Sequence, residues 1–311
     1  MTNKKVEIVT ISTDKKFYYK NLVESCKKNK GELTTLGMGE EWRGYNWKFR
    51  KMIDYLSNLS DDKIVCFVDG YDVISCRDLT ELADEFIKLK NKYKCKIIAG
   101  CDEYGIIGKK IVAHMSFGKC DNHYLNSGTY IGYVKDLKDI ISKIYQLNPS
   151  DSADDQVLMI QYYNEHPGEI HIDHECKLFL VLSYPLIDVD YFTSITINNN
   201  KLYAVNYKTM PFFIHAPGNG FLTNIIIKLG YGTPDSDVKK KLTYAMADKV
   251  YYHSKRFIID YKYIFLTLVI ILALLVYYIM INTNKGNHIN YRNNVNKGIL
   301  GVISKSLKKM I

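Results

Sequence analysis

Two acids three residues apart, Asp69 and Asp72, are the side chains whose type and spacing point most directly to chemistry. They follow the apolar run Ile64–Val68, which has the length and composition of a strand buried on both faces. Open α/β sheets bind ligands at the carboxyl ends of their strands. Two carboxylates fixed there can share one hard divalent cation, whose shell is completed by water and diphosphate oxygens. The pair therefore predicts a metal-nucleotide site, and the structural alternative is a strand end with an N-capping Asp.

Three later clusters could join this pair. The segment 125–132 contains an amide and several small residues ahead of a predicted strand, where backbone can approach a ligand closely. Asp154, Asp155 and Gln156 begin a predicted helix, a place where acids often only cap the helix. His215 ends an apolar run before a Gly-rich turn, and a neutral imidazole is a suitable ligand for Mn²⁺. Each cluster also has an ordinary interpretation, as a loop, a helix cap and a structural histidine.

The elements that must position these residues alternate along the first hundred residues. The patterns predict strands at 6–11, 33–36, 64–68 and 96–100, and helices over 18–28, 47–59 and 79–92. Such alternation favours an α/β domain with a mostly parallel sheet covered by helices on both faces. The sequence contains neither a G-x-G-x-x-G fingerprint nor a Walker loop, so neither a dinucleotide site nor a P-loop is supported.

Composition narrows the class of protein. The chain has 311 residues, 47% hydrophobic and 24% charged, which is enough for a globular domain with a substantial core. Residues 261–311 hold seven Lys or Arg and no acid, so the formal charge of +9 leaves only +2 for residues 1–260. The charge therefore gives no argument for nucleic acid as a partner. Seven cysteines without a C-x-x-C pair predict buried free thiols and neither a disulfide framework nor a zinc site.

The C-terminal part predicts a membrane segment. Residues 263–281 are nineteen residues without charge or Pro, close to the ~20 needed to cross a bilayer core. Basic residues flank both ends, so orientation is not fixed by charge. Because no secretory signal precedes the first strand, we expect residues 1–255 to form a cytosolic catalytic domain anchored by this single helix. The tail, 282–311, is basic and partly amphipathic, and it fits a helix on an anionic membrane surface or a frayed end.

The order of motifs resembles the glycosyltransferase domain of the procollagen lysyl hydroxylase family, from about Val6 to Tyr231. The motifs are E-E-W-R-G at 40–44, F-V-D-x-Y-D-V-I at 67–74, L-N-S-G at 125–128, D-D-Q at 154–156, D-H at 173–174 and H-x-x-G-N-G at 215–220. The resemblance implies a GT-A type fold that uses Mn²⁺ and UDP-glucose or UDP-galactose. It also implies transfer to hydroxylysine or galactosyl-hydroxylysine of collagen-like proteins.

The resemblance also implies roles for particular residues. The implied metal ligands are Asp69, Asp72 and His215. The implied donor-binding residues are Thr10, Thr13, Tyr71, Asn126, Asn219 and Gly220, with Tyr71 stacking near the uridine. The implied catalytic acids are Asp102, Asp154 and Asp155. Two departures leave donor choice and acceptor geometry open: the acidic run is reduced to 151–155, and the Gly-rich stretch after W-R-G is shortened to Tyr45 and Asn46.

Two rival functions have support in the residues. His171 and Asp173 with the later His215 have the H-x-D…H form of a non-haem iron triad, as in a 2-oxoglutarate dioxygenase. The parallel α/β pattern is wrong for the jelly-roll of such enzymes. The second rival is a non-catalytic, membrane-tethered sugar- or nucleotide-binding module on a degenerate glycosyltransferase fold. The intact acids and His215 argue against degeneration.

Overall fold

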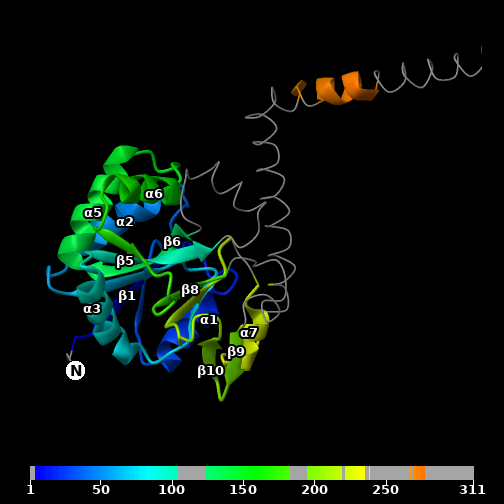
Figure 1. Ribbon diagram of the computed structural model, residues 1–311. Coiled ribbons are helices and arrows are strands. Elements are labelled where there is room, and N and C mark those ends of the chain that lie inside the picture. Colours follow the sequence, from blue (N-terminus) through cyan, green and yellow to red (C-terminus); the bar gives the residue numbers. More distant parts are fainter. Residues whose placement is uncertain are drawn as a thin grey trace, which may run out of the picture. The chain divides into compact units, whose positions relative to one another are not determined.

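The computed structural model describes residues 4–103, 123–182, 195–218, 221–234, 238, 266–267 and 269–276. The chain divides into two compact units, Met1–Met246 and Ala247–Ile311. The strands and labelled helices of Figure 1 belong to the first unit, which carries all of the motifs identified in the sequence. The predicted domain end at residue 255 lies outside the described residues.

The first unit is built on a central sheet. Within the described ranges its strand order is β2-β1-β3-β6-β5-β7. The strands are β1 (Val6–Ile11), β2 (Leu33–Leu36), β3 (Ile64–Val68), β5 (Ile97–Glu103), β6 (His123–Tyr133) and β7 (Ile170–Ile172). Neighbouring strands are parallel except at β6, which runs antiparallel to both β3 and β5. The predicted α/β architecture with a mostly parallel sheet is confirmed.

Helices cover both faces of this sheet (Figure 1). The helices are α1 (Tyr19–Lys28), α2 (Trp47–Leu56), α3 (Leu82–Tyr93), α5 (Val134–Leu147) and α6 (Asp155–Glu165). Side chains of α2, α5 and α6 pack in one core, and those of α1 and α3 pack in the other. The predicted helix over 79–92 begins as a separate 3₁₀ turn, Leu79–Glu81, and the Asp78 side chain caps this turn by accepting from the Thr80 N–H.

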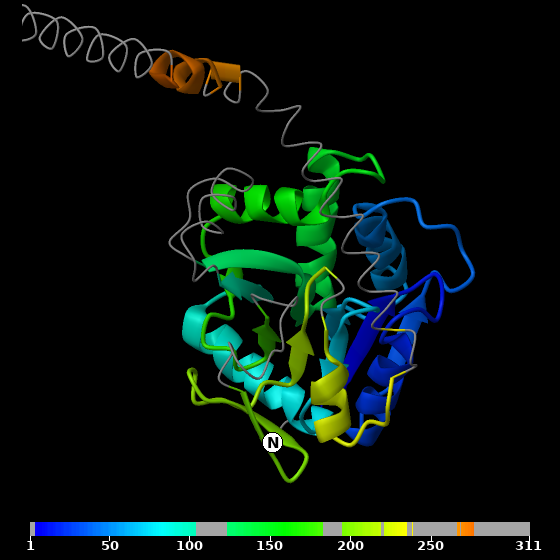
Figure 2. The same cartoon turned by 90° about the vertical axis from the view of Figure 1, so that its right-hand side faces the viewer.

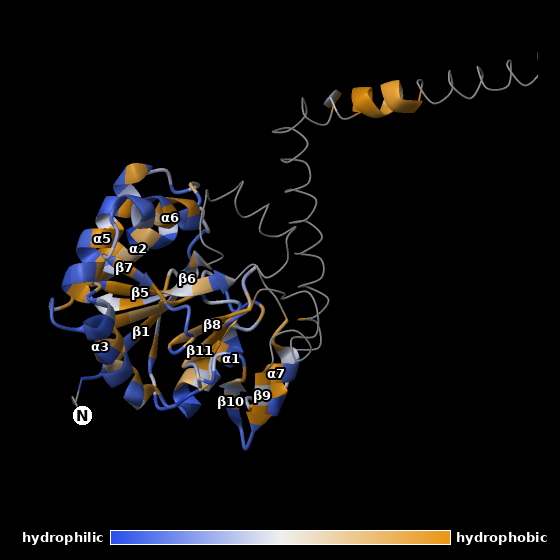
Figure 3. Cartoon of the chain, in the orientation of Figure 1, coloured by the Kyte–Doolittle hydropathy of each residue, from blue (hydrophilic) through white to orange (hydrophobic). Residues whose placement is uncertain are grey.

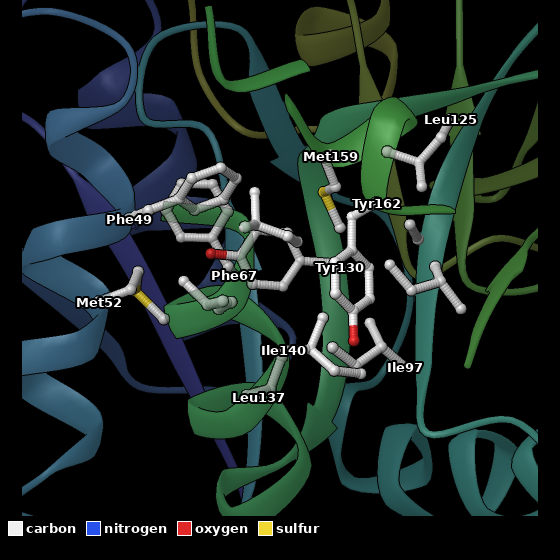
Figure 4. Close-up of a cluster of buried hydrophobic side chains, with 14 of the residues drawn as sticks. Phe49, Met52, Phe67, Ile97, Leu125, Tyr130, Leu137, Ile140, Met159 and Tyr162 are labelled. Atoms are coloured by element: carbon white, nitrogen blue, oxygen red, sulfur yellow. The ribbon is translucent and has the colours of Figure 1, made fainter. Parts of the chain in front are cut away.

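Successive side chains along a strand point alternately into the two cores. Val65 and Phe67 of β3 point into the core beneath α2, α5 and α6, while Cys66 points into the core beneath α1 and α3. Figure 4 shows the first core, where Phe67 stacks on Tyr130 with ring centroids 4.8 Å apart. This packing on both faces explains why β3 reads as an uninterrupted apolar run, and it holds the end of β3 rigidly.

A smaller sheet lies beside the central one. Its described strands are β4 (Val73–Ser75), β11 (Phe213–His215) and β8 (Phe179–Val181), in the order β4-β11-β8. A third core joins it to α7 (Thr223–Lys228) and to the hairpin of β9 (Ile195–Asn198) and β10 (Lys201–Ala204), which projects from the body in both Figure 1 and Figure 2. Residues 69–72 therefore cross from the end of β3 to the start of β4, with an acid at each end of the crossing.

One sequence-based interpretation is wrong. The segment 125–132 is not a loop ahead of a strand, because it lies within β6. Its Asn, Ser and Gly residues indicate a loop by propensity, but Asn126 pairs with Gly100 of β5 and Thr129 pairs with Val68 of β3, with a shift of the β5–β6 register between Ala99 and Gly100. The irregularity places these small residues next to the acids that follow β3.

The predicted membrane segment receives no support from the structure. In the parts of the chain that are described, no helix is both long and apolar enough to cross a membrane. Of residues 263–281, only 266–267 and 269–276 are described; they are helical, and Figure 3 colours most of them as hydrophobic. The rest of the segment and the tail 282–311 lie outside the described residues.

Candidate active site

Asp69, Asp72 and His215 meet at the junction of the two sheets. Asp69 follows β3, Asp72 precedes β4, and His215 ends β11. One ligand atom from each lies within 4.8 Å of the others, the only such group of His, Cys or acidic side chains that the described residues contain. His215 Nε2 is 3.3 Å from Asp72 Oδ1 and 3.9 Å from Asp69 Oδ2. The structure thus brings together the predicted metal ligands.

Strand pairing fixes this geometry. His215 lies opposite Val73 in the antiparallel β4–β11 pair, and the N–H of Ala216 donates to the carbonyl of Asp72 at 2.8 Å. The N–H of Asp69 donates to the carbonyl of Gly128 in β6, also at 2.8 Å. The backbone that carries each of these three side chains is therefore held by hydrogen bonds to a neighbouring segment. This keeps the side chains in place before a ligand binds.

The hydrogen bonds of His215 determine which ring nitrogen is free. Asn126 Oδ1 accepts from the N–H of Gly128 at 3.0 Å, which identifies it as the oxygen of the amide. His215 Nδ1 lies 3.0 Å from the same oxygen, so Nδ1 carries the proton and donates it. In the neutral ring Nε2 then has a free lone pair, which is buried and lies 3.3 Å from Asp72 Oδ1. A histidine that ligates a metal has this arrangement.

The donor set fits a divalent cation. Two carboxylates and one imidazole lone pair make a mixed oxygen and nitrogen set that Mn²⁺ accepts. Burial lowers the pKa of His215, but the charge of Asp72, its hydrogen bond to the protonated ring, and the charges of Asp69 and Asp102 outweigh burial and raise the pKa above the ordinary value. The same negative potential that favours a proton on this ring favours a metal ion near it.

Glycine is required at the centre of the site. A Cβ on Gly128 would lie 2.4 Å from His215 Cε1 and 2.6 Å from Asp69 Oδ2. A Cβ on Gly70 would lie 1.9 Å from Ser12 Oγ, at the end of β1. Other parts of the site approach the backbone too closely at these two positions for any side chain, which explains the glycine of L-N-S-G and the glycine between the two acids.

Asp102 joins the site through an amide network. Asn126 Nδ2 donates to Asp102 Oδ2 at 3.2 Å, and Gln156 Nε2 donates to the same oxygen at 3.3 Å. Asp102 is buried near the end of β5. Asn126 thus contacts both Asp102 and His215. The hydrogen bonds of Asn126 therefore connect Asp102 to the predicted metal ligands.

The two acids of D-D-Q are placed differently. Asp155 is the first residue of α6 and is buried, with its carboxylate 2.8 Å from Lys48 Nζ. Asp154 is exposed, and its Oδ1 accepts from the N–H of Val157, so it caps α6. The capping interpretation is confirmed for Asp154, while Asp155 lies in the group of buried carboxylates.

Lys48 is the site residue that sequence reasoning missed. Its ammonium lies 2.9 Å from Asp69 Oδ1 as well as beside Asp155, and the side chain is only 8% exposed. Burial lowers the pKa of Lys48, but the two carboxylates raise it more, so the net shift is upward and the charge is retained. A signal existed in the sequence: position 48 lies on the same helical stripe as Met52 and Leu56, which are buried.

The predicted nucleotide-binding residues lie near this group. Tyr71 lies between the two acids, and its hydroxyl accepts from the N–H groups of Thr13 and Asp14 at 3.1 and 3.2 Å. Thr10 is fully buried near the end of β1, and its hydroxyl has no hydrogen-bond partner. The Tyr71 hydroxyl and Thr13 therefore meet just beyond the end of β1, whereas Asn219 and Gly220 lie outside the described residues.

The iron-triad interpretation is wrong. The buried carboxylate of Asp173 accepts three backbone N–H groups, from Lys177, Leu178 and Phe179, at 2.7 to 3.1 Å. His171 stacks on Tyr93 with ring centroids 3.6 Å apart. Neither side chain belongs to the metal-ligand group that contains His215. Asp173 stabilises a turn, and the H-x-D spacing is coincidental.

Comparison with known proteins identifies the family to which this site belongs. The family described as the PLOD GT domain matches residues 2–237. The chain belongs to this family. Because the matched domain is a glycosyltransferase, the resemblance drawn from the motifs is confirmed and the binding-module alternative is not favoured.

Individual relatives agree with this assignment. The "Multifunctional procollagen lysine hydroxylase and glycosyltransferase LH3" of Homo sapiens is 28% identical over 234 residues, which cover 70% of this chain and 30% of the relative. The "Procollagen-lysine,2-oxoglutarate 5-dioxygenase" of Drosophila melanogaster is 27% identical over 235 residues, covering 70% and 31%. This chain therefore matches less than a third of the length of these relatives.

A solved structure also resembles the chain. It is a glycosyltransferase involved in the glycosylation of the major capsid of PBCV-1. It has 15% sequence identity and a TM-score of 0.42, and the match covers 69% of this chain and 95% of that one.

Proposed function

We propose that this PLOD GT domain is a GT-A type, Mn²⁺-dependent hexosyltransferase. It moves glucose or galactose from a UDP-sugar to hydroxylysine or galactosyl-hydroxylysine of collagen-like proteins. The observation that carries the proposal is the group of Asp69, Asp72 and His215, in which the buried Nε2 faces both carboxylates. The relatives named as procollagen lysine hydroxylases and glycosyltransferases support the choice of acceptor.

Asp69, Asp72 and His215 would hold the cation beside the donor diphosphate. A divalent cation there neutralises the charge that develops on the leaving UDP, which is commonly the largest contribution to catalysis. Asn126 accepts a hydrogen bond from the Nδ1–H of His215 and so leaves the Nε2 lone pair of the neutral ring for the cation. Thr10, Thr13 and Tyr71 line the end of β1 beside the acids and would bind the uridine, with Asn219 and Gly220 near the diphosphate.

The buried acids would act on the sugars. Asp102, held by Asn126 and Gln156, would orient the donor hexose. In the transfer, the bond from the anomeric carbon to the β-phosphate oxygen breaks, and UDP leaves with the electron pair. The acceptor hydroxyl oxygen forms the new bond and gives its proton to a carboxylate, for which Asp155 is our choice. Asp154, exposed at the cap of α6, would contact the acceptor.

The sequence supports a separate proposal about location. We propose that residues 263–281 attach the domain to a membrane, with the glycosyltransferase domain on the cytosolic side. The support is the uncharged sequence of this segment. Carbonate extraction followed by protease protection of the full chain tests it, and release of the chain by carbonate would contradict it.

The function is tested by UDP release. The full chain is assayed with Mn²⁺ and UDP-glucose or UDP-galactose, with and without a peptide containing hydroxylysine or galactosyl-hydroxylysine. We expect release from one donor, stimulation by one acceptor and loss with EDTA. A folded protein that binds UDP but releases none from either donor would support the tethered binding module instead.

A further inference from the structure

Lys48 connects the metal-ligand group to the acid at the start of α6. Its Nζ lies 2.9 Å from Asp69 Oδ1 and 2.8 Å from Asp155 Oδ2. The other oxygen of Asp69, Oδ2, is the one that faces His215 Nε2. The Asp69 carboxylate therefore lies between the ammonium of Lys48 on one side and the imidazole of His215 on the other.

The charges around Lys48 are buried and close together. The side chains of Lys48 and Asp155 are 8% and 6% exposed, and that of Asp69 is 27% exposed. In such surroundings charge interactions are weakly screened, and removing one partner of a buried pair leaves an uncompensated charge. A cation bound at Asp69 Oδ2 must share that carboxylate with the ammonium at Oδ1.

The segments that carry Lys48 and Asp155 are also joined without Lys48. At the start of α2, the N–H of Asn46 donates to the carbonyl of Ala153 at 3.1 Å, and its Nδ2 donates to that of Ser150 at 3.0 Å. Arg50 forms an ion pair with Asp151 at 2.7 Å. These contacts hold α2 to the segment that precedes α6 without Lys48, so the buried charge of Lys48 is available for another purpose.

We propose that Lys48 is a positioning residue that holds Asp155 beside Asp69 and, by competing for Asp69, weakens the binding of Mn²⁺. The inference rests on the proposed function, because it takes the cation site and the role of Asp155 from there. A weakened cation site keeps the metal exchangeable with the departing UDP, while the fixed Asp155 faces the acceptor. If Lys48 had only a structural purpose, its removal would lower both the Mn²⁺ affinity and the rate of UDP release.

The test is a double-mutant cycle in the full chain. Mn²⁺ binding is measured by the EPR signal of the free ion for the wild type, Lys48→Met, Asp155→Asn and the double variant. We expect Lys48→Met to bind Mn²⁺ about fivefold more tightly or better, because a repelling charge is gone. Asp155→Asn should bind it about fivefold more weakly, because the ammonium then acts on Asp69 alone. The double variant should return to within about twofold of the wild type.

The rate of UDP release should change in the opposite direction to the Mn²⁺ affinity. Lys48→Met should lower acceptor-stimulated UDP release about tenfold or more, because Asp155 has lost its partner. Release without acceptor should fall less. Lys143→Met removes the same charge from an exposed pair with Asp139 on α5, and it should change neither property.

The outcomes separate the two proposals. A wild-type chain that binds no Mn²⁺ overturns both. Wild-type binding combined with unchanged or weaker binding in Lys48→Met overturns the role of Lys48 and leaves the proposed function standing. If Lys48→Met does not fold, Asp155→Asn decides, and an unchanged Mn²⁺ affinity in that variant overturns the inference.

Discussion

The side-chain oxygen of Asn126 accepts a hydrogen bond from the Nδ1–H of His215, with 3.0 Å between Nδ1 and Oδ1, and at the same time accepts one from the N–H of Gly128. These two hydrogen bonds leave the opposite ring nitrogen, Nε2, with a lone pair directed at the carboxylates of the site. A residue of β6 thus determines the tautomer of a residue of β11. The proposed metal site consequently depends on four strands, β3, β4, β6 and β11, and cannot be assigned to one motif.

Replacement of Asn126 by Ala should weaken Mn²⁺ binding about 10- to 100-fold, the usual cost of losing the partner that orients a ligating histidine. The ring of His215 would then be free to turn or to change tautomer. Isothermal titration of the full chain with Mn²⁺ measures the effect. Asn58→Ala serves as the control because Asn58 is exposed and its side chain donates to the carbonyl of Asp54, within its own turn. Equal affinities of the two variants would contradict the tautomer argument.

Replacement of Gly128 by Ala should abolish Mn²⁺ binding in a protein that still folds. The added Cβ would meet both His215 and Asp69 below 3.0 Å, so these ligands must move apart. We expect a loss of about 1 to 3 kcal/mol in the free energy of unfolding from the overpacking. Ser127→Ala on the same strand adds no atom and should retain binding. Mn²⁺ titration and urea unfolding check both variants, and a Gly128→Ala protein with wild-type affinity would refute the close approach.

Replacement of Asp173 by Ala should destabilise the fold and spare the metal site. Three buried backbone N–H groups would lose their acceptor, which costs about 3 kcal/mol in the free energy of unfolding. Urea unfolding measures that loss. Mn²⁺ affinity measured below the unfolding transition should be unchanged. A specific loss of metal binding would return Asp173 to the list of candidate ligands.

Acid should destabilise the domain through His171. Burial first, and the neighbouring His174 second, lower the pKa of His171 to about 4. The unfolded chain takes up this proton near pH 6.5 and the folded chain does not, so the contribution is complete above 6.5 and is lost as pH falls to about 4. Because the ring is partly exposed, we expect a loss of about 1 to 2 kcal/mol.

The variant His171→Phe isolates this effect. It keeps an aromatic ring on Tyr93 and removes the titration. Urea unfolding at a series of pH values should show a shallower loss of stability between pH 6.5 and 4 than in the wild type. The same slope in both proteins would assign the acid sensitivity to other groups.

Local sequence patterns predicted the elements and several site residues. The apolar run before Asp69 marks a strand buried on both faces, and acids at its end mark the ligand edge of the sheet. The run before His215 marks a strand in the same way. These predictions succeed because burial and periodicity are properties of a few neighbouring residues.

Long-range features could not be predicted in this way. The pairing of β4 with β11 brings Asp72 beside His215 from distant parts of the chain, and only the order of motifs suggested it. Strand β6 contains Asn, Ser and Gly because a close approach to the metal ligands requires them, so propensity indicated a loop. Lys48 was missed because a lysine in a helix is normally exposed, and its carboxylate partners lie on other elements.

The most direct test of the account compares Mn²⁺-dependent UDP release by the full chain with that of Asp72→Ala and His215→Ala. We expect the wild type to release UDP from one hexose donor only when Mn²⁺ is present, and both variants to lose this activity while their circular dichroism spectra remain unchanged. Metal-dependent release by either folded variant at the wild-type rate would contradict the assignment of Asp69, Asp72 and His215 as the metal site.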